Sequence, residues 1–157
     1  MIKHEILALK EQKYVGIKTV IPFKEAEQIN YLQLHKNVYG ADINDIDQKE
    51  SVMAIDTDFT EDSFSYTPLV PVHSFDYNEG FTRFIREQGT YYAFEVKARD
   101  LNPSWFKRVF EYIKENNITI ENAGYDLEYY NKDLKTMSSS IDDSEERVLK
   151  ILLKMQS

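Results

Sequence analysis

The chain has 157 residues, 42% of them hydrophobic, with a net charge of −8 and no cysteine. This length fits one domain with a buried core, and the absence of cysteine excludes disulfides, a thiol nucleophile and a cysteine metal site. The acidic balance argues against direct nucleic-acid binding, which needs Lys and Arg, and favours cationic ligands. Without a signal peptide or an apolar run near the roughly 20 residues that span a bilayer, we expect a cytoplasmic protein and no membrane partner.

The first predicted elements are a strand and a helix. Side chains alternate from Tyr14 onward, and we predict a strand over residues 5–22 with a bulge near Glu11 and Gln12. Pro22 then precedes a run of good helix formers over residues 24–40. Its apolar stripe consists of Ala26, Ile29, Leu32, Leu34 and Val38, and Gly40 ends it.

Two strands complete the first half of the chain. The polar and acidic residues 41–50 form a loop. Residues 51–62 and 63–75 have strand composition, and they are joined by a turn around Glu61 and Asp62. The order of the first half is therefore strand, helix, strand, strand.

The second half begins with a strand over residues 90–96 and continues with the strongest helix pattern in the chain, within residues 100–117. Asn102 is its N-cap and Pro103 takes the first helical position. The apolar stripe of this helix consists of Trp105 or Phe106, Val109, Phe110 and Ile113. The next strand lies in residues 118–131, after a turn at residues 122–124.

The C-terminal part contains a polar loop over residues 132–146 and a short apolar run in residues 146–156. That run fits a strand or a helical turn by periodicity, and we favour a strand because the matching position in the first half is one. The chain thus has two strand-helix-strand-strand units, at about residues 1–78 and 79–157, inside a single domain over residues 1–157. This order indicates an α+β fold.

One group of motifs resembles a known family over residues 81–131. A glycine precedes an aromatic-rich strand, a tryptophan stands near the start of the following helix, and an apolar–Glu–apolar–Tyr strand closes the group. The residues concerned are Gly89, Tyr91, Phe94, Trp105, Leu127, Glu128, Tyr129 and Tyr130. This pattern is similar to that of the GyrI-like small-molecule-binding family, whose domain is also the effector-binding half of AraC-type and MerR-type transcription regulators.

The resemblance implies two pseudo-symmetric units that form one curved antiparallel sheet, with helices on one face and a ligand groove between the units. In multidrug-sensing members the strand glutamate, here Glu128, faces a cationic aromatic ligand. The sequence has no helix-turn-helix segment. We therefore expect a stand-alone domain that binds a small organic molecule, apolar or cationic, and that acts in sequestration or regulation.

Strand alternation places Asp126, Glu128 and Tyr130 on one face. Leu127 and Tyr129 lie on the other face, where we expect them to pack against the helix of residues 100–117. Glu128 then points away from the helices. A solvated surface carboxylate is the alternative interpretation, whereas an enclosed one could attract a cation or act as a general base.

The expected ligand-binding residues are Glu128, Tyr130, Trp105, Tyr92 and Tyr66. Aromatic faces stack on planar ligands and attract cations. Plain core packing is an equal alternative for Trp105, and a surface position is the alternative for Tyr66.

The resemblance leaves two other functions open. The first is hydrolysis of strained, electrophilic cyclopropane-type compounds, in which Glu128 would activate water and a tyrosine hydroxyl would protonate the leaving carbon. The second is a protein-interaction or inhibitor module, with a protein partner and no small-molecule ligand.

No metal or cofactor is expected. His4, His35 and His73 lack ligand spacing, and the acidic residues 41–47 lack the glycine and terminal glutamate of a calcium loop. The sequence contains neither a phosphate-binding loop nor a dinucleotide fingerprint.

Overall fold

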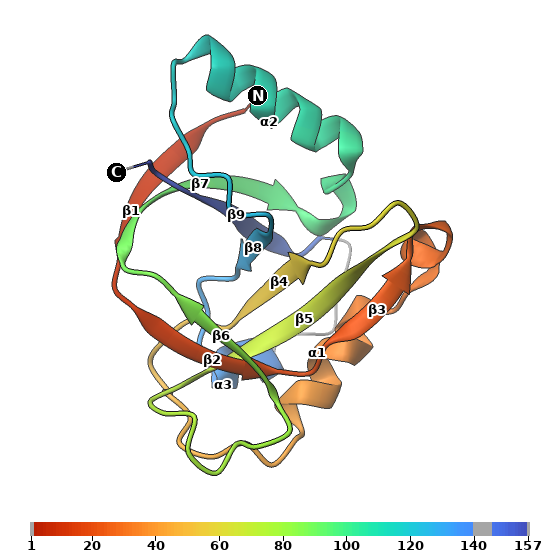
Figure 1. Cartoon of the computed structure of the whole chain (residues 1–157), viewed down its shortest axis with the longest axis vertical. Helices are drawn as coiled ribbons and strands as arrows, with labels where there is room; N and C mark the ends of the chain where they lie inside the picture. Colours follow the sequence, from red (N-terminus) through yellow and green to blue (C-terminus); the bar gives the residue numbers. More distant parts are fainter. Residues whose placement is uncertain (1, 140–145, 157) are drawn as a thin grey trace.

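A computed structural model describes residues 2–139 and 146–156 (Figure 1). Its elements, in chain order, are β1 (His4–Leu9), β2 (Gln12–Gly16), β3 (Thr19–Pro22), η1 (Phe23–Gln28), α1 (Tyr31–Tyr39), β4 (Met53–Thr57), β5 (Ser63–Val72), β6 (Thr82–Arg86), β7 (Gly89–Lys97), η2 (Ala98–Asp100), α2 (Pro103–Glu115), β8 (Asp126–Tyr129), α3 (Leu134–Ser139) and β9 (Val148–Lys154). None of the helices in these ranges is long and apolar enough to cross a membrane.

The strands form one antiparallel sheet of nine strands, in the order β1-β7-β9-β8-β4-β5-β2-β6, with β3 paired to β5. The order is symmetric about the β4–β8 pair: β2, α1, β4 and β5 on one side correspond to β7, α2, β8 and β9 on the other. The predicted α+β fold, with repeated strand-helix-strand-strand order and a curved antiparallel sheet, is confirmed. The expected boundary near residue 78 lies in the connection between β5 and β6.

The first predicted strand is divided into three. β1 pairs with β7 near one end of the sheet, whereas β2 pairs with β5 and β6 near the other end. The chain therefore passes between the two ends of the sheet at residues 10–11, next to the predicted bulge, and the β6–β7 connection makes the reverse passage. Because both connections are short, the sheet curls strongly, as Figure 1 shows.

The two main helices follow their capping residues. The Asn102 side chain accepts a hydrogen bond from the Trp105 backbone N–H at 2.9 Å, as predicted for α2. The predicted helix over residues 24–40 is split, because the Asn30 side chain caps a new helix by accepting from the Gln33 N–H at 3.1 Å. Phe110 is 48% exposed, so its place in the apolar stripe of α2 was predicted wrongly.

The polar segment 132–146 is not wholly a loop. It contains the short helix α3, whose Met137 side chain is 1% exposed and packs in the core. The Asp133 carboxylate caps α3 by accepting from the Thr136 N–H at 2.7 Å. Residues 140–145 of the predicted loop lie outside the described residues. The run at the C-terminus is the strand β9, as predicted.

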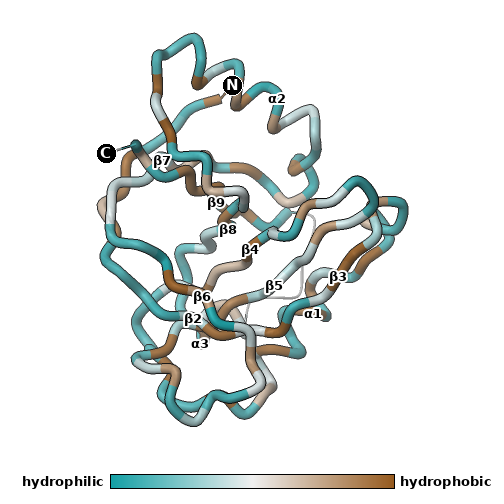
Figure 2. Tube along the Cα trace, in the orientation of Figure 1, coloured by the Kyte–Doolittle hydropathy of each residue, from teal (hydrophilic) through white to brown (hydrophobic). Residues whose placement is uncertain are grey.

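Two apolar clusters lie on the two faces of the sheet. The helix-side cluster includes Leu32 of α1, Trp105 and Val109 of α2, and Tyr130. The second cluster is built by the curled sheet itself, from Tyr14, Met53, Ile55, Leu69, Tyr91, Ala93, Leu127, Tyr129 and Leu152. Figure 2 accordingly shows hydrophobic stretches along the strands and an alternation of hydrophobic and hydrophilic residues along α2.

These clusters correct one prediction. Leu127 and Tyr129 do share a face, but they pack in the second cluster and not against α2. Glu128 and Tyr130 consequently face the helix side. The expectation failed because it assigned only one buried face to the sheet, whereas the curling of the sheet buries both.

Candidate functional site

Glu128 lies in the centre of the sheet. Strand β8 runs between β4 and β9, so Glu128 stands between Ala54 and Ile151. Its side chain is 4% exposed. One carboxylate oxygen, Oε1, accepts hydrogen bonds from the Tyr130 hydroxyl at 2.9 Å and the Tyr66 hydroxyl at 3.4 Å. The carboxyl group predicted from the sequence is therefore enclosed by the protein and not solvated.

Two further carboxyl groups stand next to Glu128. Asp56 of β4 and Asp126 of β8 are directly paired across the two strands. Burial raises the pKa of Asp56 well above its usual value, and the charge of Glu128 and a hydrogen bond with Glu128 raise it further. Burial, and then the charge of Glu128, raise the pKa of Asp126 to about 6. We call Asp56, Asp126 and Glu128 the carboxyl cluster.

The arrangement of the carboxyl cluster favours a bound proton. Ionised carboxylates that lie close together repel one another, and a proton shared between them relieves this repulsion. Burial and the neighbouring Glu128 therefore favour the protonated form of Asp56. The cluster thus places the buried carboxyl group of Glu128 beside two partly buried ones.

Tyrosines surround the carboxyl cluster, and we call Tyr31, Tyr66 and Tyr130 the tyrosine shell. The rings of Tyr31 and Tyr66 meet edge to face at 4.9 Å between centroids. Burial raises the pKa of Tyr31 to about 12, with further contributions from Asp56 and Glu128. The hydroxyls are therefore protonated at neutral pH and can donate hydrogen bonds, while the ring faces suit a cation.

A buried histidine, which sequence reasoning had treated only as a rejected metal ligand, supports the tyrosine shell. His35 of α1 is 0% exposed, and its Nε2 lies 2.7 Å from the Tyr66 hydroxyl. Its Nδ1 lies 2.9 Å from the Tyr39 hydroxyl. Burial, and then the charge of Arg147, lower the pKa of His35 to about 3, so the ring is neutral. A neutral ring donates to one hydroxyl and accepts from the other, which fixes the orientation of Tyr66.

A groove of about 470 Å³ opens beside Tyr130. Its lining includes Tyr129, Tyr130, Met137, Arg147, Leu149 and Lys150. The Arg147 guanidinium carbon lies 5.7 Å from the centre of the Tyr130 ring. The groove therefore extends to Tyr130, whose hydroxyl is hydrogen-bonded to Glu128.

The structure brings only some of the predicted site residues together. Glu128, Tyr130 and Tyr66 form one hydrogen-bonded group. Trp105 lies in the same apolar cluster, where its ring packs against Phe106 at 5.1 Å. Tyr92 is partly buried and packs edge to face against His4 at 5.4 Å. Trp105 therefore lies in a core-packing position, which was the alternative to ligand binding that the sequence left open.

Sequence reasoning also missed Asp56. A signal existed, since Asp56 interrupts an apolar strand in the same way that Glu128 does. Recognising it would have required the pairing of β4 with β8, which the sequence does not give. Among residues 2–139 and 146–156, no group of His, Asp and Glu side chains is arranged to hold a metal ion.

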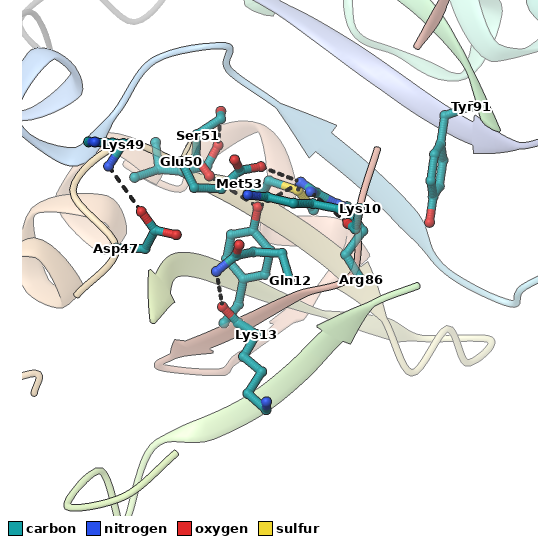
Figure 3. A network of polar contacts seen from close by, with 12 residues as sticks. Lys10, Gln12, Lys13, Asp47, Lys49, Glu50, Ser51, Met53, Arg86 and Tyr91 are labelled. Atoms are coloured by element: carbon teal, nitrogen blue, oxygen red, sulfur yellow. Dashed lines mark hydrogen bonds and ion pairs between the residues drawn. The ribbon is translucent and has the colours of Figure 1, made fainter. Parts of the chain in front are cut away.

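A second buried polar group lies on the opposite face and holds the fold together (Figure 3). Arg86 of β6 is 1% exposed and forms an ion pair of 2.9 Å with Glu50, which lies just before β4. The guanidinium also donates to the Tyr14 hydroxyl at 2.9 Å and to the Lys10 carbonyl at 3.0 Å. These contacts tie the loop before β4 to β2 and β6, and they close the end of the second cluster.

Comparisons of structures show which known proteins share this fold. The chain has the fold of SAV2435 bound to tetraphenylphosphonium, at a TM-score of 0.63 and 12% identity, over 99% of this chain and 94% of that one. It also has the fold of the EcmrR C-terminal domain, at a TM-score of 0.64 and 15% identity, over 100% of this chain and 99% of that one. In an EcmrR–DNA complex, the matching part spans 58% of the EcmrR chain.

A hydrolase from Listeria innocua has the same fold at a TM-score of 0.55 and 8% identity, over 98% of this chain and 92% of that one. The sequence itself matches no protein-family model and no curated protein. At these identities the likeness shows the fold. The fold that the resemblance implied is thereby confirmed.

Proposed function

We propose that this protein binds an aromatic organic cation at the carboxyl cluster, within the tyrosine shell. The observation that carries the proposal is the buried Glu128, beside which β4 and β8 place the partly buried Asp56 and Asp126. Burying several carboxyl groups together is unfavourable unless a proton or a cation offsets their charge. A ligand cation would take over the role of the shared proton, while the ring faces of the tyrosine shell would contact its apolar part.

The comparisons supply the chemical class of a probe. SAV2435, which shares the fold, was solved with tetraphenylphosphonium, a cation enclosed by aromatic rings. In this chain a carboxyl group and aromatic surface lie together at Glu128, Tyr66 and Tyr130. The domain would act by sequestering such a ligand or by signalling its presence to another chain.

The test is a calorimetric titration of tetraphenylphosphonium into the wild type and Glu128→Gln. Glutamine retains an oxygen that accepts from Tyr130 but removes the charge. A unit charge about 5 Å from a cation contributes about 3 kcal/mol at an effective dielectric constant of about 20, so we expect binding to weaken at least tenfold. Glu111→Gln, an exposed site on α2, is the matched control and should bind as the wild type does.

Two results would reject the proposal. One is the absence of any binding to the wild type across a panel of aromatic cations. The other is equal affinity of the wild type and Glu128→Gln. A stoichiometric protein complex that survives Glu128→Gln would instead assign the chain to the interaction class.

A second candidate, hydrolysis of strained cyclopropane-type compounds, is favoured by the 2.9 Å hydrogen bond between Tyr130 and Glu128 and by the fold of the Listeria innocua hydrolase. Glu128 would remove a proton from water, the oxygen would attack a ring carbon, and the carbon–carbon bond would break. Tyr130 would protonate the leaving carbon and then recover a proton from Glu128. Turnover that disappears in Glu128→Gln and in Tyr130→Phe, with ligand binding retained, would select this function.

A further inference from the structure

One cation of the protein already lies at the candidate site. Arg147 immediately precedes β9, and its guanidinium carbon is 5.7 Å from the centre of the Tyr130 ring. The hydroxyl of the same ring donates to Glu128 at 2.9 Å. A guanidinium is planar and weakly hydrated, so it stacks on aromatic rings as an aromatic cation does.

We propose that Arg147 is an internal counter-cation that occupies the ligand's place on Tyr130, and that a cationic ligand binds by displacing the Arg147 side chain into the adjacent groove. This inference rests on the proposed function and assigns a residue that sets the affinity and selectivity of that site. It also explains how a ligand reaches a carboxyl group that is only 4% exposed.

The electrostatics of Arg147 agree with this assignment. Burial disfavours its charge, whereas Tyr130, Tyr66 and Glu128 raise its pKa; the two tyrosines do so through their ionised form, which is absent at neutral pH. These are the same side chains that would hold a ligand cation. The positive charge of Arg147 also acts on His35, which is hydrogen-bonded to Tyr66, because it adds to the effect of burial in lowering the pKa of His35. A second cation could not bind beside Arg147 without strong repulsion.

The groove provides a destination for the displaced side chain. Tyr130 and Arg147 line the groove of about 470 Å³, together with Glu95 and Glu146. Glu146 already binds Lys97 at 3.0 Å and also Arg99, which shows that it accepts cationic partners. After displacement, the guanidinium would remain near negative charge and water, while the ring face of Tyr130 would be free for the ligand.

The selectivity of the site follows from this exchange. Small cations make few contacts with the rings and cannot replace the stacking of a guanidinium. An aromatic cation contacts several rings at once and can therefore replace the stacking of the guanidinium. We therefore expect the site to discriminate by aromatic surface and by charge together, with ammonium-type cations of low aromatic content excluded.

The experiment is a titration of tetraphenylphosphonium into Arg147→Met, which keeps an unbranched side chain but removes the charge and the planar group. Loss of the competitor should tighten binding about tenfold relative to the wild type. Arg108→Met, an exposed position on α2, is the matched control and should leave the affinity unchanged. Arg147→Lys retains the charge and should stay within a fewfold of the wild type, and it provides the test if Arg147→Met does not fold.

The outcomes separate this inference from the proposed function. Affinity that is unchanged or weaker in Arg147→Met, with Glu128→Gln still weakening binding, overturns the role of Arg147 and leaves the proposed function intact. An Arg147→Lys variant that gains as much affinity as Arg147→Met also overturns it. Affinity that does not respond to Glu128→Gln in either background rejects the proposed function itself.

Discussion

Asp126→Asn should stabilise the protein at neutral pH. Burial, followed by the charge of Glu128, raises the pKa of Asp126 from 3.8 to about 6. At about 1.4 kcal/mol for each tenfold change in proton affinity, this difference corresponds to about 3 kcal/mol. The folded protein favours the protonated carboxyl, so its stabilising contribution is fully present below pH 3.8 and is lost as the pH rises through about 6.

Asparagine resembles the protonated form at every pH. We therefore expect Asp126→Asn to exceed the wild type by up to about 3 kcal/mol in free energy of unfolding at pH 7.5, and to match it near pH 4. Urea unfolding followed by circular dichroism at several pH values measures the difference. Asp42→Asn, at an exposed loop position, controls for general loss of charge.

Two outcomes would refute this reasoning. One is a difference between Asp126→Asn and the wild type that does not depend on pH between 4 and 7.5. The other is an Asp126→Asn variant that is less stable at pH 7.5. If the prediction holds, the carboxyl cluster costs stability that a bound cation would restore, as expected of a site kept for binding.

Three further predictions concern the buried ion pair, a strand contact and the pH dependence of binding. Glu50→Gln leaves Arg86, which is 1% exposed, without its counter-charge and should cost about 3 kcal/mol of unfolding free energy. Arg86→Met leaves Glu50, which is 18% exposed and hydrated, and should cost less. Equal losses of unfolding free energy in urea would contradict this expectation. Gly16→Ala would place a Cβ 2.1 Å from a backbone oxygen of β5 and should cost about 2 kcal/mol or more, whereas Gly40→Ala, 3.4 Å from its neighbour, should be almost neutral in thermal unfolding. Affinity for tetraphenylphosphonium should rise fewfold from pH 5 to pH 7 as Asp126 loses its proton, and a titration that shows a fall would count against the carboxyl cluster as the site.

Local sequence patterns predicted most of the elements because their causes are local. Alternation marks a strand such as β7, and an N-cap followed by proline marks α2, through contacts within a few residues. Alternation also placed Glu128 and Tyr130 on one face and Leu127 on the other. The short helix α3 was not predicted because Met137 is its only buried residue, and its sequence therefore has no periodic apolar stripe.

The sequence by itself determined the order of the elements, their repeat, and the separation of Glu128 from Leu127 and Tyr129 by strand alternation. Only the tertiary structure decided what each face touches. The passage of the chain between the two ends of the sheet curls it and buries both faces, which moved Leu127 and Tyr129 away from α2. The pairing of β4 with β8 brought Asp56 beside Glu128, and the packing of α1 brought in His35, because contacts across long sequence separations leave no local pattern.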